Sequence, residues 1–412
     1  MKELAINGGK PTHTKPWRTG PFHIPEELRI LEKVLAGPAL PMARGPRITA
    51  LREQLQDVYG MRYAVPVSSG SAAIHVALFA AGVAAGDEVI VSPLTDYGSV
   101  IGVFQLNAIP VFADVRPDSL MMDVDDIARR ITSRTRAIMP VHNGGYAVDM
   151  RALMKLVKGR DIKVVEDCAQ AHLAKLGQKY VGTYGHCGAW SFNESKHMKA
   201  GEGGFVLTND KKLAAMADLF ADKCYARIPG KPANPAFPAL NVRLNEINAA
   251  LASVQFKHLP RWIEKRRRFA AAFHEGIADV RGISPEPQPK GANPSYWWVS
   301  FVVDAEILGV DAPRFCQMLE AEGIPSGAQL QNYMPGWEVF RKLNEDPDIF
   351  PTYRPGRLAK GMYAEDIAPV AQRAGARLGA VSITQHNTVA EARAAAKAVD
   401  KIAGALGVLS DE

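Results

Sequence analysis

Short apolar runs alternate with segments of helical period along the first half of the chain. The apolar runs lie at 64–67, 88–91, 110–113, 137–141, 162–165 and 188–192. Helical periodicity is clearest at 72–81, 124–131 and 150–158. Strands that alternate with helices at this spacing are typical of a parallel sheet with helices on its faces. Ligands of such sheets bind beyond the carboxyl ends of the strands, so the residues that follow each run are the first candidates for a site.

The chain on either side of this region has a different pattern. A Gly/Pro-rich arm with helical patterns precedes the first strand, and beyond residue 260 a long helix pattern is followed by mixed elements. The mixed elements are a strand at 296–303, a helix near 312–322, an irregular Pro-rich stretch at 333–355, a strand near 380–383 and a last helix at 389–406. Since 412 residues exceed the size of one ordinary core, we expect a large domain at 1–260, which includes the arm, and a small domain at 261–412.

Composition and charge exclude several classes of protein. A hydrophobic fraction of 47% with 22% charged residues is that of an ordinary globular protein, and the absence of a signal-peptide core or an apolar span predicts a cytoplasmic protein without a membrane partner. The four cysteines form no CxxC pair, which argues against a disulfide framework and a thiolate zinc site. A net charge of +6 does not require nucleic acid, and the basic run at 261–268 is more typical of a solvated helix face.

The segment 190–204, WSFNESKHMKAGEGG, carries the strongest candidate chemistry. It places Lys196 shortly before a glycine-rich turn and the apolar run 205–207. A lysine held at the edge of a β-rich region suggests Schiff-base chemistry, which requires that burial or a nearby cation lowers the pKa of the amine. A solvated loop lysine is the simpler alternative.

Polar residues follow several of the predicted strands. The first strand is followed by SSGS at a helix N-terminus, which is either a phosphate site or a plain serine cap. Later strands are followed by Asp96, Tyr97, His142, Glu166, Asp167, Gln170 and His172. A carboxylate there either lies buried against a cation or caps a turn. Neither these histidines nor His186 and Cys187 have the spacing of a zinc motif, so we expect no metal.

Five motifs together resemble those of the DegT/StrS-type sugar aminotransferases, which are fold-type I pyridoxal phosphate enzymes. The motifs are SSGSAAIHVAL, EDCAQAH, SFNESKHMKAGEGG, LTND and ALNVRLNEINAALASVQ. The resemblance covers nearly the whole chain. It implies an α/β fold with a mainly parallel seven-stranded sheet between helices and a smaller α+β C-terminal domain.

The resemblance implies pyridoxal 5'-phosphate (PLP) as cofactor and a role for each matching residue. Lys196 resembles the Schiff-base lysine, with Lys199 rejected on position. Asp167 resembles the carboxylate that pairs with the pyridine nitrogen and Gln170 the residue that contacts the ring hydroxyl. The phosphate contacts match Gly70, Ser71 and Ser191, with Asn241 reaching the phosphate from a second subunit. A homodimer with shared active sites follows.

Two positions qualify this match. Many relatives carry an aromatic residue, stacked on the cofactor, directly after the threonine that corresponds to Thr95, whereas here Asp96 follows and Tyr97 comes next. Either Tyr97 takes the stacking role or another residue covers that face of the cofactor. A related branch of sugar dehydratases carries histidine in place of the lysine. Here His197 follows an intact Lys196, which favours transamination.

The implied reaction transfers an amino group from L-glutamate or L-glutamine to a keto sugar, which in this family is most often nucleotide-linked. A cyclitol or another small ketone is an alternative acceptor, and a non-catalytic regulator that binds PLP or sugar is an alternative function. Candidate acceptor contacts, chosen from loops that the family folds over the site, are Arg227, Gln329, Tyr333 and His386.

Overall fold

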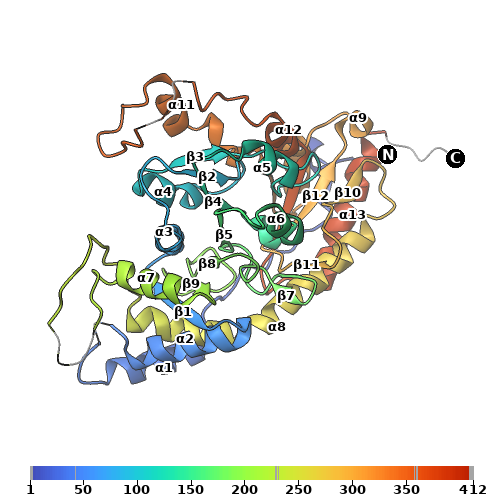
Figure 1. Ribbon diagram of the computed structural model, residues 1–412. Helices are drawn as coiled ribbons and strands as arrows, with labels where there is room; N and C mark the ends of the chain where they lie inside the picture. Colours follow the sequence, from blue (N-terminus) through green and yellow to red (C-terminus); the bar gives the residue numbers. More distant parts are fainter. Residues whose placement is uncertain are drawn as a thin grey trace.

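A seven-stranded sheet forms the centre of the molecule (Figure 1). The computed structural model describes residues 3–41, 43–227, 230, 232–356, 358 and 361–407. The strand order is β1-β9-β8-β5-β4-β2-β3. The strands are β1 (Tyr63–Val67), β2 (Glu88–Val91), β3 (Ile109–Phe112), β4 (Thr135–Met139), β5 (Lys163–Asp167), β8 (Cys187–Ser191) and β9 (Gly204–Thr208).

The central sheet is mainly parallel, which confirms the predicted fold class. Strands β8, β5, β4, β2 and β3 run parallel, whereas β9 is antiparallel to both β8 and β1. The reversal at β9 follows from the short connection 192–203, because a parallel pair needs a longer crossover. This connection is the segment that carries Lys196.

Apolar residues cover both faces of the central sheet. Val164 belongs to one core cluster and the next residue, Val165, to the other. Such alternation, with both faces buried, is expected of a sheet between two layers of helices. The helices of this part are α1 (Pro25–Leu35), α2 (Pro46–Tyr59), α3 (Gly70–Ala80), α4 (Gly98–Gln105), α5 (Val124–Arg130), α6 (Met150–Leu156) and α7 (Lys211–Ala221).

A second, antiparallel sheet forms the small domain. Its order is β10 (Ile283–Pro285), β12 (Trp298–Val303), β14 (Leu378–Ser382) and β13 (Ser326–Ala328). It packs with α10 (Ala312–Ala321) and α13 (Val389–Ala405) in its own core cluster. The remaining elements are the strands β6 (Lys175–Leu176), β7 (Lys179–Tyr180) and β11 (Ala292–Asn293), and the helices α9 (Ala305–Leu308), α11 (Glu338–Glu345) and α12 (Pro369–Arg377).

One helix connects the two sheets. Helix α8 (Glu246–Gly276) contacts α1 and α2 beside the large sheet and α13 beside the small one. It therefore begins well before the long helix expected beyond residue 260. The domain boundary predicted at 260/261 falls inside α8, which is continuous through Pro260.

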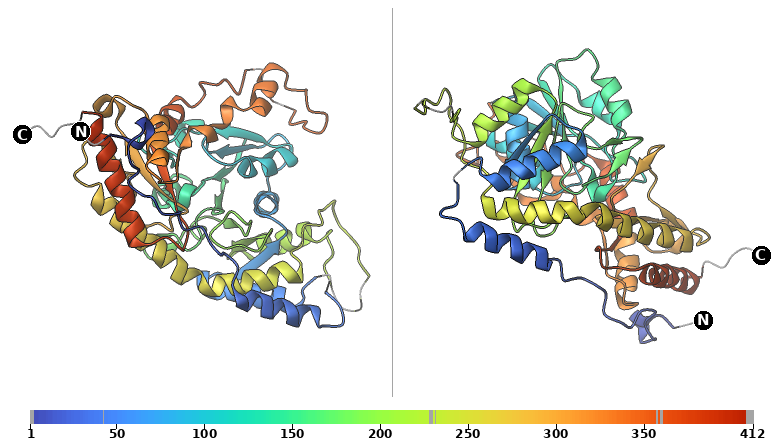
Figure 2. Two further views of the ribbon diagram at one scale, coloured as in Figure 1. Left: turned by 180° about the vertical axis from the view of Figure 1, so that it is seen from behind. Right: turned by 90° about the horizontal axis from the view of Figure 1, so that it is seen from below.

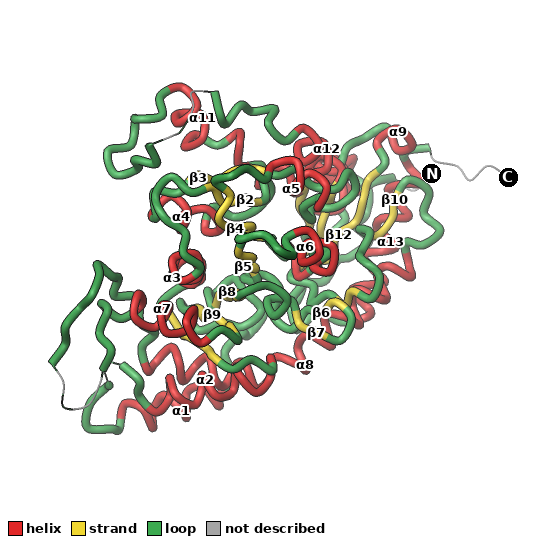
Figure 3. The backbone as a smooth tube through the Cα atoms, viewed as in Figure 1, coloured by secondary structure: helices red, strands yellow, loops and turns green. Residues whose placement is uncertain are grey.

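Two other segments cross between the domains. The N-terminal arm lies along the small domain (Figure 2), where the Glu322 carboxylate accepts hydrogen bonds from the N–H groups of Ala5 at 2.9 Å and Thr12 at 2.8 Å. The irregular stretch around α11, mostly loop in Figure 3, lies instead against the edge strand β3. There the hydroxyl groups of Tyr353 and Tyr363 donate to main-chain carbonyls at 3.0 and 3.1 Å. This cover protects the edge of the large sheet from pairing with another chain.

None of the helices formed by the described residues is long and apolar enough to cross a membrane. The location of the protein in the cell stays a prediction.

Candidate active site

Two adjoining cavities open at the carboxyl ends of the strands of the large sheet. We call them the serine cavity, of about 370 Å³, and the tryptophan cavity, of about 360 Å³. Asp96, Gln170 and Lys196 line both. The serine cavity is also lined by Ser69, Gly70, Ser71, Ser99, Asp167, Ser191 and Asn193 among others. The tryptophan cavity is also lined by Asn143, Trp297, Trp298, Ser326, Gln329, Asn332 and Ser382 among others, so both sheets contribute to it.

Lys196 lies where the two cavities meet. Its Nζ lies 4.2 Å from the ring centroid of Trp297. Its main-chain N–H donates to the Asn193 carbonyl at 2.9 Å, which fixes the turn after β8. Burial lowers the pKa of Lys196, while the charges of Asp96 and Asp167 oppose that shift. A lysine with a lowered pKa supplies more neutral amine, which is the form that attacks a carbonyl.

Asp167 ends β5 at the floor of the serine cavity. Its carboxylate accepts hydrogen bonds from the Ser99 hydroxyl at 2.7 Å and from the Ala169 N–H at 3.0 Å. Burial raises the pKa of Asp167, and these two hydrogen bonds oppose the shift. No ion pair to Asp167 occurs among the described side chains. The charge of Lys196 acts on Asp167 without an ion-pair contact, so the carboxylate is free to hold a cationic, protonated ring nitrogen.

The N-terminus of α3 closes the other end of the serine cavity. Ser69 caps the helix by accepting a hydrogen bond from the Ala72 N–H at 3.0 Å. A Cβ on Gly70 would lie 2.6 Å from Ser191 Cβ, so only glycine fits between the helix and the end of β8. The free N–H groups and the helix dipole, together with the Ser71 and Ser191 side chains in the lining, make a site for an anion such as phosphate.

Neutral polar groups surround these charged residues. The Gln170 side-chain oxygen accepts a hydrogen bond from the Gly144 N–H at 2.8 Å, which orients its amide between the cavities. His172 Nε2 donates to the Ser191 carbonyl at 2.8 Å, and His197 Nε2 donates to the Ser295 carbonyl at 3.2 Å. Burial lowers the pKa of His172 to about 4 and that of His197 well below its usual value, so both are neutral.

The structure does not place Tyr97 in either cavity lining. Its ring packs against Phe104 and Trp337 at the start of α4. The Asp96 side chain lies in the lining instead, where its carboxylate accepts a hydrogen bond from the Gly98 N–H at 2.8 Å. An apolar ring at the first turn of α4 gains more by packing on that helix than by facing a polar cavity.

Of the four candidate acceptor contacts, Gln329 alone lines a cavity in the described part of the chain. Tyr333 is buried, and its hydroxyl donates to the Glu365 carbonyl. Arg227 forms a two-pronged ion pair with Asp222, with N–O distances of 2.6 and 2.8 Å. His386 packs on Phe22 of the N-terminal arm.

The predicted phosphate contact Asn241 and the rejected lysine Lys199 both lie outside the two linings. Asn241 is exposed, and its main chain forms an antiparallel bridge with Asp222. Lys199 turns its amine toward the Glu194 carbonyl and the Phe22 ring.

Sequence reasoning missed the residues that the small domain and the loop after β4 contribute. Trp297 and Trp298 fall in the strand expected at 296–303, and Asn143 follows the candidate His142 without being a candidate itself. Ser99, the hydrogen-bond donor to Asp167, lies in α4, which the apolar pattern did not reveal. The spacing of residues within a motif does not indicate which residues of a distant segment will contact it in the folded chain.

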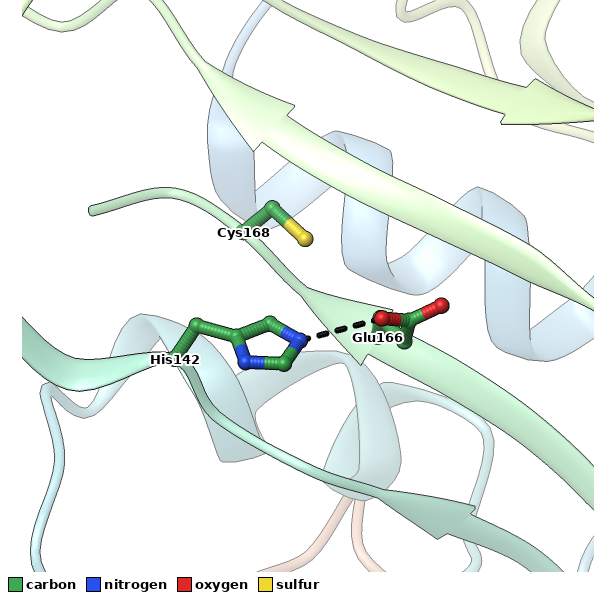
Figure 4. Close-up of side chains that lie close together, drawn as sticks. All are labelled: His142, Glu166 and Cys168. Carbon is green, nitrogen blue, oxygen red and sulfur yellow. Dashed lines mark hydrogen bonds and ion pairs between the residues drawn. The ribbon is translucent and has the colours of Figure 1, made fainter. Parts of the chain in front are cut away.

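His142, Glu166 and Cys168 lie close together at the ends of β4 and β5 (Figure 4). Glu166 accepts hydrogen bonds from His142 Nε2 at 3.1 Å and from the N–H groups of Gly182, Tyr184 and Gly185 at 2.6–2.8 Å. His142 Nδ1 in turn accepts the Val148 N–H at 3.2 Å, and burial raises the pKa of the Cys168 thiol well above its usual value. With their lone pairs engaged and the thiol neutral, these groups join β4 and β5 to the following loops and are poorly suited to hold a metal ion.

Several known proteins are similar to this chain in sequence and in fold. The chain is 33% identical over 407 residues, 92% of each sequence, to an L-glutamine:2-deoxy-scyllo-inosose aminotransferase of Micromonospora echinospora. It is 34% identical to the GDP-perosamine synthase of Escherichia coli O157:H7 over 63% of this chain and 70% of that one. The solved structure of an aminotransferase from Psychrobacter cryohalolentis superposes with a TM-score of 0.82 at 26% identity, over 95% of this chain and all of that one.

A family model also matches residues 23–348, a span that includes both sides of the serine cavity. The chain therefore belongs to the DegT/DnrJ/EryC1/StrS aminotransferase family, and the protein is an aminotransferase.

Proposed function

We propose that the protein is a PLP-dependent aminotransferase that acts through Lys196. The observation that carries this proposal is one cavity with a helix N-terminus, a buried carboxylate and a lysine of lowered pKa on its walls. The α3 N-terminus would hold the phosphate, Asp167 the pyridine nitrogen and Gln170 the ring hydroxyl, while Lys196 would form the Schiff base. The residues present therefore fit PLP.

The chain's own residues would divide the chemistry as follows. When bound, PLP withdraws electrons from the α-carbon of the amino compound. Asp167 keeps a proton on the ring nitrogen, because a neighbouring carboxylate favours the cationic form. Lys196 Nζ, once free and neutral, removes the proton from the α-carbon of the donor as general base, and later returns a proton as general acid to the product carbon.

The named relatives favour L-glutamine as the amino donor, with L-glutamate as the alternative. The printed name of the Micromonospora relative specifies L-glutamine. The tryptophan cavity, which adjoins Lys196, would receive both the donor and the acceptor in turn.

The lining of the tryptophan cavity favours a ring ketone with several hydroxyl groups. It offers amides, hydroxyls and the faces of two indole rings. Lys196 is its sole basic side chain among the described residues. An uncharged keto cyclitol suits this lining, as it would suit the inosose aminotransferase relative. A nucleotide-linked keto sugar, which the GDP-perosamine synthase relative favours, is the second candidate. Its diphosphate would need cations from outside this lining.

An absorbance experiment tests the proposal. Wild-type protein with PLP should show a visible Schiff-base band that L-glutamine or L-glutamate bleaches, and Lys196→Ala should lack it. Lys199→Ala is the matched control, since Lys199 lies in the same loop but outside both cavities. Mass spectrometry of the products from 2-deoxy-scyllo-inosose and from a GDP-linked keto sugar then separates the two acceptors. A wild-type protein without the band, or a Lys196→Ala variant that turns over normally, would contradict the assignment.

A further inference from the structure

A buried arginine lies behind the wall of the tryptophan cavity. Arg266, in the middle of α8, is 3% exposed, and its Nη1 group donates hydrogen bonds to three main-chain carbonyls. The acceptors are Tyr296 at 3.0 Å, Trp297 at 3.2 Å and Ile383 at 2.9 Å. Burial lowers the pKa of Arg266 to about 9. A buried charge costs free energy that such hydrogen bonds offset, so the segments that offer the carbonyls are held firmly in place.

The segment that Arg266 holds carries the indole beside Lys196. Trp297 Nε1 donates to the Ser195 carbonyl at 2.8 Å, and its main-chain N–H donates to the Gly144 carbonyl at 2.7 Å. The preceding residue, Tyr296, has a φ of 51°, a left-handed conformation that an aromatic residue rarely adopts without support. The Arg266 hydrogen bond to the Tyr296 carbonyl supplies such support.

The charges near Lys196 come from several elements. Asp96 and Asp167 act on it directly and favour its protonated form. His172 and His197 are neutral because burial lowers the pKa of each, and the Lys199 amine lies by Phe22. The charge of Arg266 acts on His197 and Lys199. Burial is the largest influence on the pKa of Lys196, and the Trp297 ring supplies part of that burial.

We propose that Arg266 is a positioning residue for the reaction: through three carbonyls it holds the Trp297 indole against Lys196, and the indole keeps water away from the lysine nitrogen. The contacts join α8 and the small sheet to the loop that carries the reactive amine. Arg266 itself touches neither substrate nor cofactor. This inference deepens the proposed function, because it concerns the lysine on which that function rests.

The test measures the protonation of Lys196 in the cofactor-free, full-length protein. Reductive methylation with formaldehyde and cyanoborohydride labels neutral amines, and mass spectrometry of the Lys196 peptide gives its rate at each pH. In Arg266→Met the indole is released, so the amine loses its contact with the ring face, which favours the charged form. Water reaches the amine in its place and stabilises the charged form by more than that contact did. We expect labelling at neutral pH to slow by about tenfold, the factor that corresponds to one pH unit. Trp297→Ala should slow the labelling of Lys196 to a similar extent. Trp297→Phe keeps a ring at this position and should be labelled at nearly the wild-type rate.

Arg267→Met is the matched control. Arg267 follows Arg266 on the same helix and donates to the carbonyls of Pro294 at 3.0 Å, Leu173 at 3.1 Å and Asn293 at 3.4 Å, so its hydrogen bonds go to residues other than Trp297. In Arg267→Met, the labelling rate of Lys196 should depend on pH as it does in the wild-type protein. If Arg266→Met does not fold, Arg266→Lys, which keeps a cation with three N–H donors but on a shorter side chain, should give a smaller shift in the same direction.

Two results would overturn the proposal. One is a folded Arg266 variant in which the labelling rate of Lys196 depends on pH as in wild type. The other is an Arg267→Met protein in which this pH dependence shifts as much as in Arg266→Met. The labelling needs no PLP and no substrate, so its failure is distinguishable from a missing absorbance band, which would instead count against the proposed function.

Discussion

At the scale of single residues, the site contains the carboxylic acid of Asp167 and the amine of Lys196. Burial shifts the pKa of the acid upward and that of the amine downward. Each shift brings the group nearer to neutrality in the unloaded protein. A bound cationic ring nitrogen would lower the pKa of Asp167, since a neighbouring positive charge favours the charged carboxylate.

Removing the Ser99 hydroxyl tests how Asp167 is held in its charged form. The Ser99 hydrogen bond lowers the pKa of Asp167, so Ser99→Ala should raise that pKa further. Since activity requires the carboxylate, the acidic limb of the pH profile of kcat/KM should move to higher pH while activity above the limb is retained. Asp167→Asn, which cannot be charged, should lose at least about 100-fold in kcat at every pH. An unchanged acidic limb in Ser99→Ala would show that another group sets it.

At the scale of secondary structure, the proposed phosphate site depends on the close approach of α3 to the end of β8. Gly70 permits that approach because a Cβ there would lie 2.6 Å from Ser191 Cβ and 2.8 Å from its Oγ. The same glycine begins the helix whose free N–H groups face the serine cavity.

Gly70→Ala should therefore separate the helix from the strand. Overpacking of this kind costs about 1–3 kcal/mol of unfolding free energy. We also expect PLP to bind about tenfold more weakly, a loss of about 1.4 kcal/mol. Thermal unfolding and a fluorescence titration with PLP measure the two effects. Gly404→Ala in α13 is the control, since a Cβ there meets nothing within 4 Å and alanine favours a helix. Equal PLP affinity in Gly70→Ala and wild type would contradict the proposed phosphate site.

Elements with a strong local pattern could be predicted from the sequence, and contacts between distant elements could not. The strands of the large sheet and the helices α3, α5 and α6 lie where alternation and helical period place them. The reversed direction of β9 and the early start of α8 depend on tertiary packing rather than on local pattern. In the site, Lys196, Asp167 and Gly70 follow strand ends, where a ligand is expected. Trp297 reaches the site from the loop that leads into β12 of the small sheet, and Tyr97 packs on Phe104 and Trp337, contacts that no motif indicates.

At the scale of the whole molecule, the homodimer that the resemblance implies would complete the site. Asn241 is exposed in the single chain and lies outside both cavities. If it reaches the phosphate of a second subunit, each site needs Lys196 from one chain and Asn241 from the other.

Mixing two inactive variants tests shared sites. Lys196→Ala and Asn241→Ala chains, unfolded and refolded together, should regain activity, because one of the two sites in each mixed dimer would be intact. Random pairing gives about one quarter of wild-type activity. Separately refolded variants, combined afterwards, are the control. Activity equal to the sum of the two parents, with mixed dimers shown by mass spectrometry, would place Asn241 outside the partner's site.

The continuous helix α8 also limits how relatives of this protein can diverge in length. It spans Glu246–Gly276, with α1 and α2 beside its first part and the Arg266 contacts in its second. One residue inserted before Arg266 would turn the following part of the helix by about 100° and advance it by about 1.5 Å. The guanidinium would then point away from Trp297. The small sheet would also be displaced relative to the large sheet, because α8 connects the two. Insertions and deletions in evolution should accordingly accumulate in the loops and spare this helix.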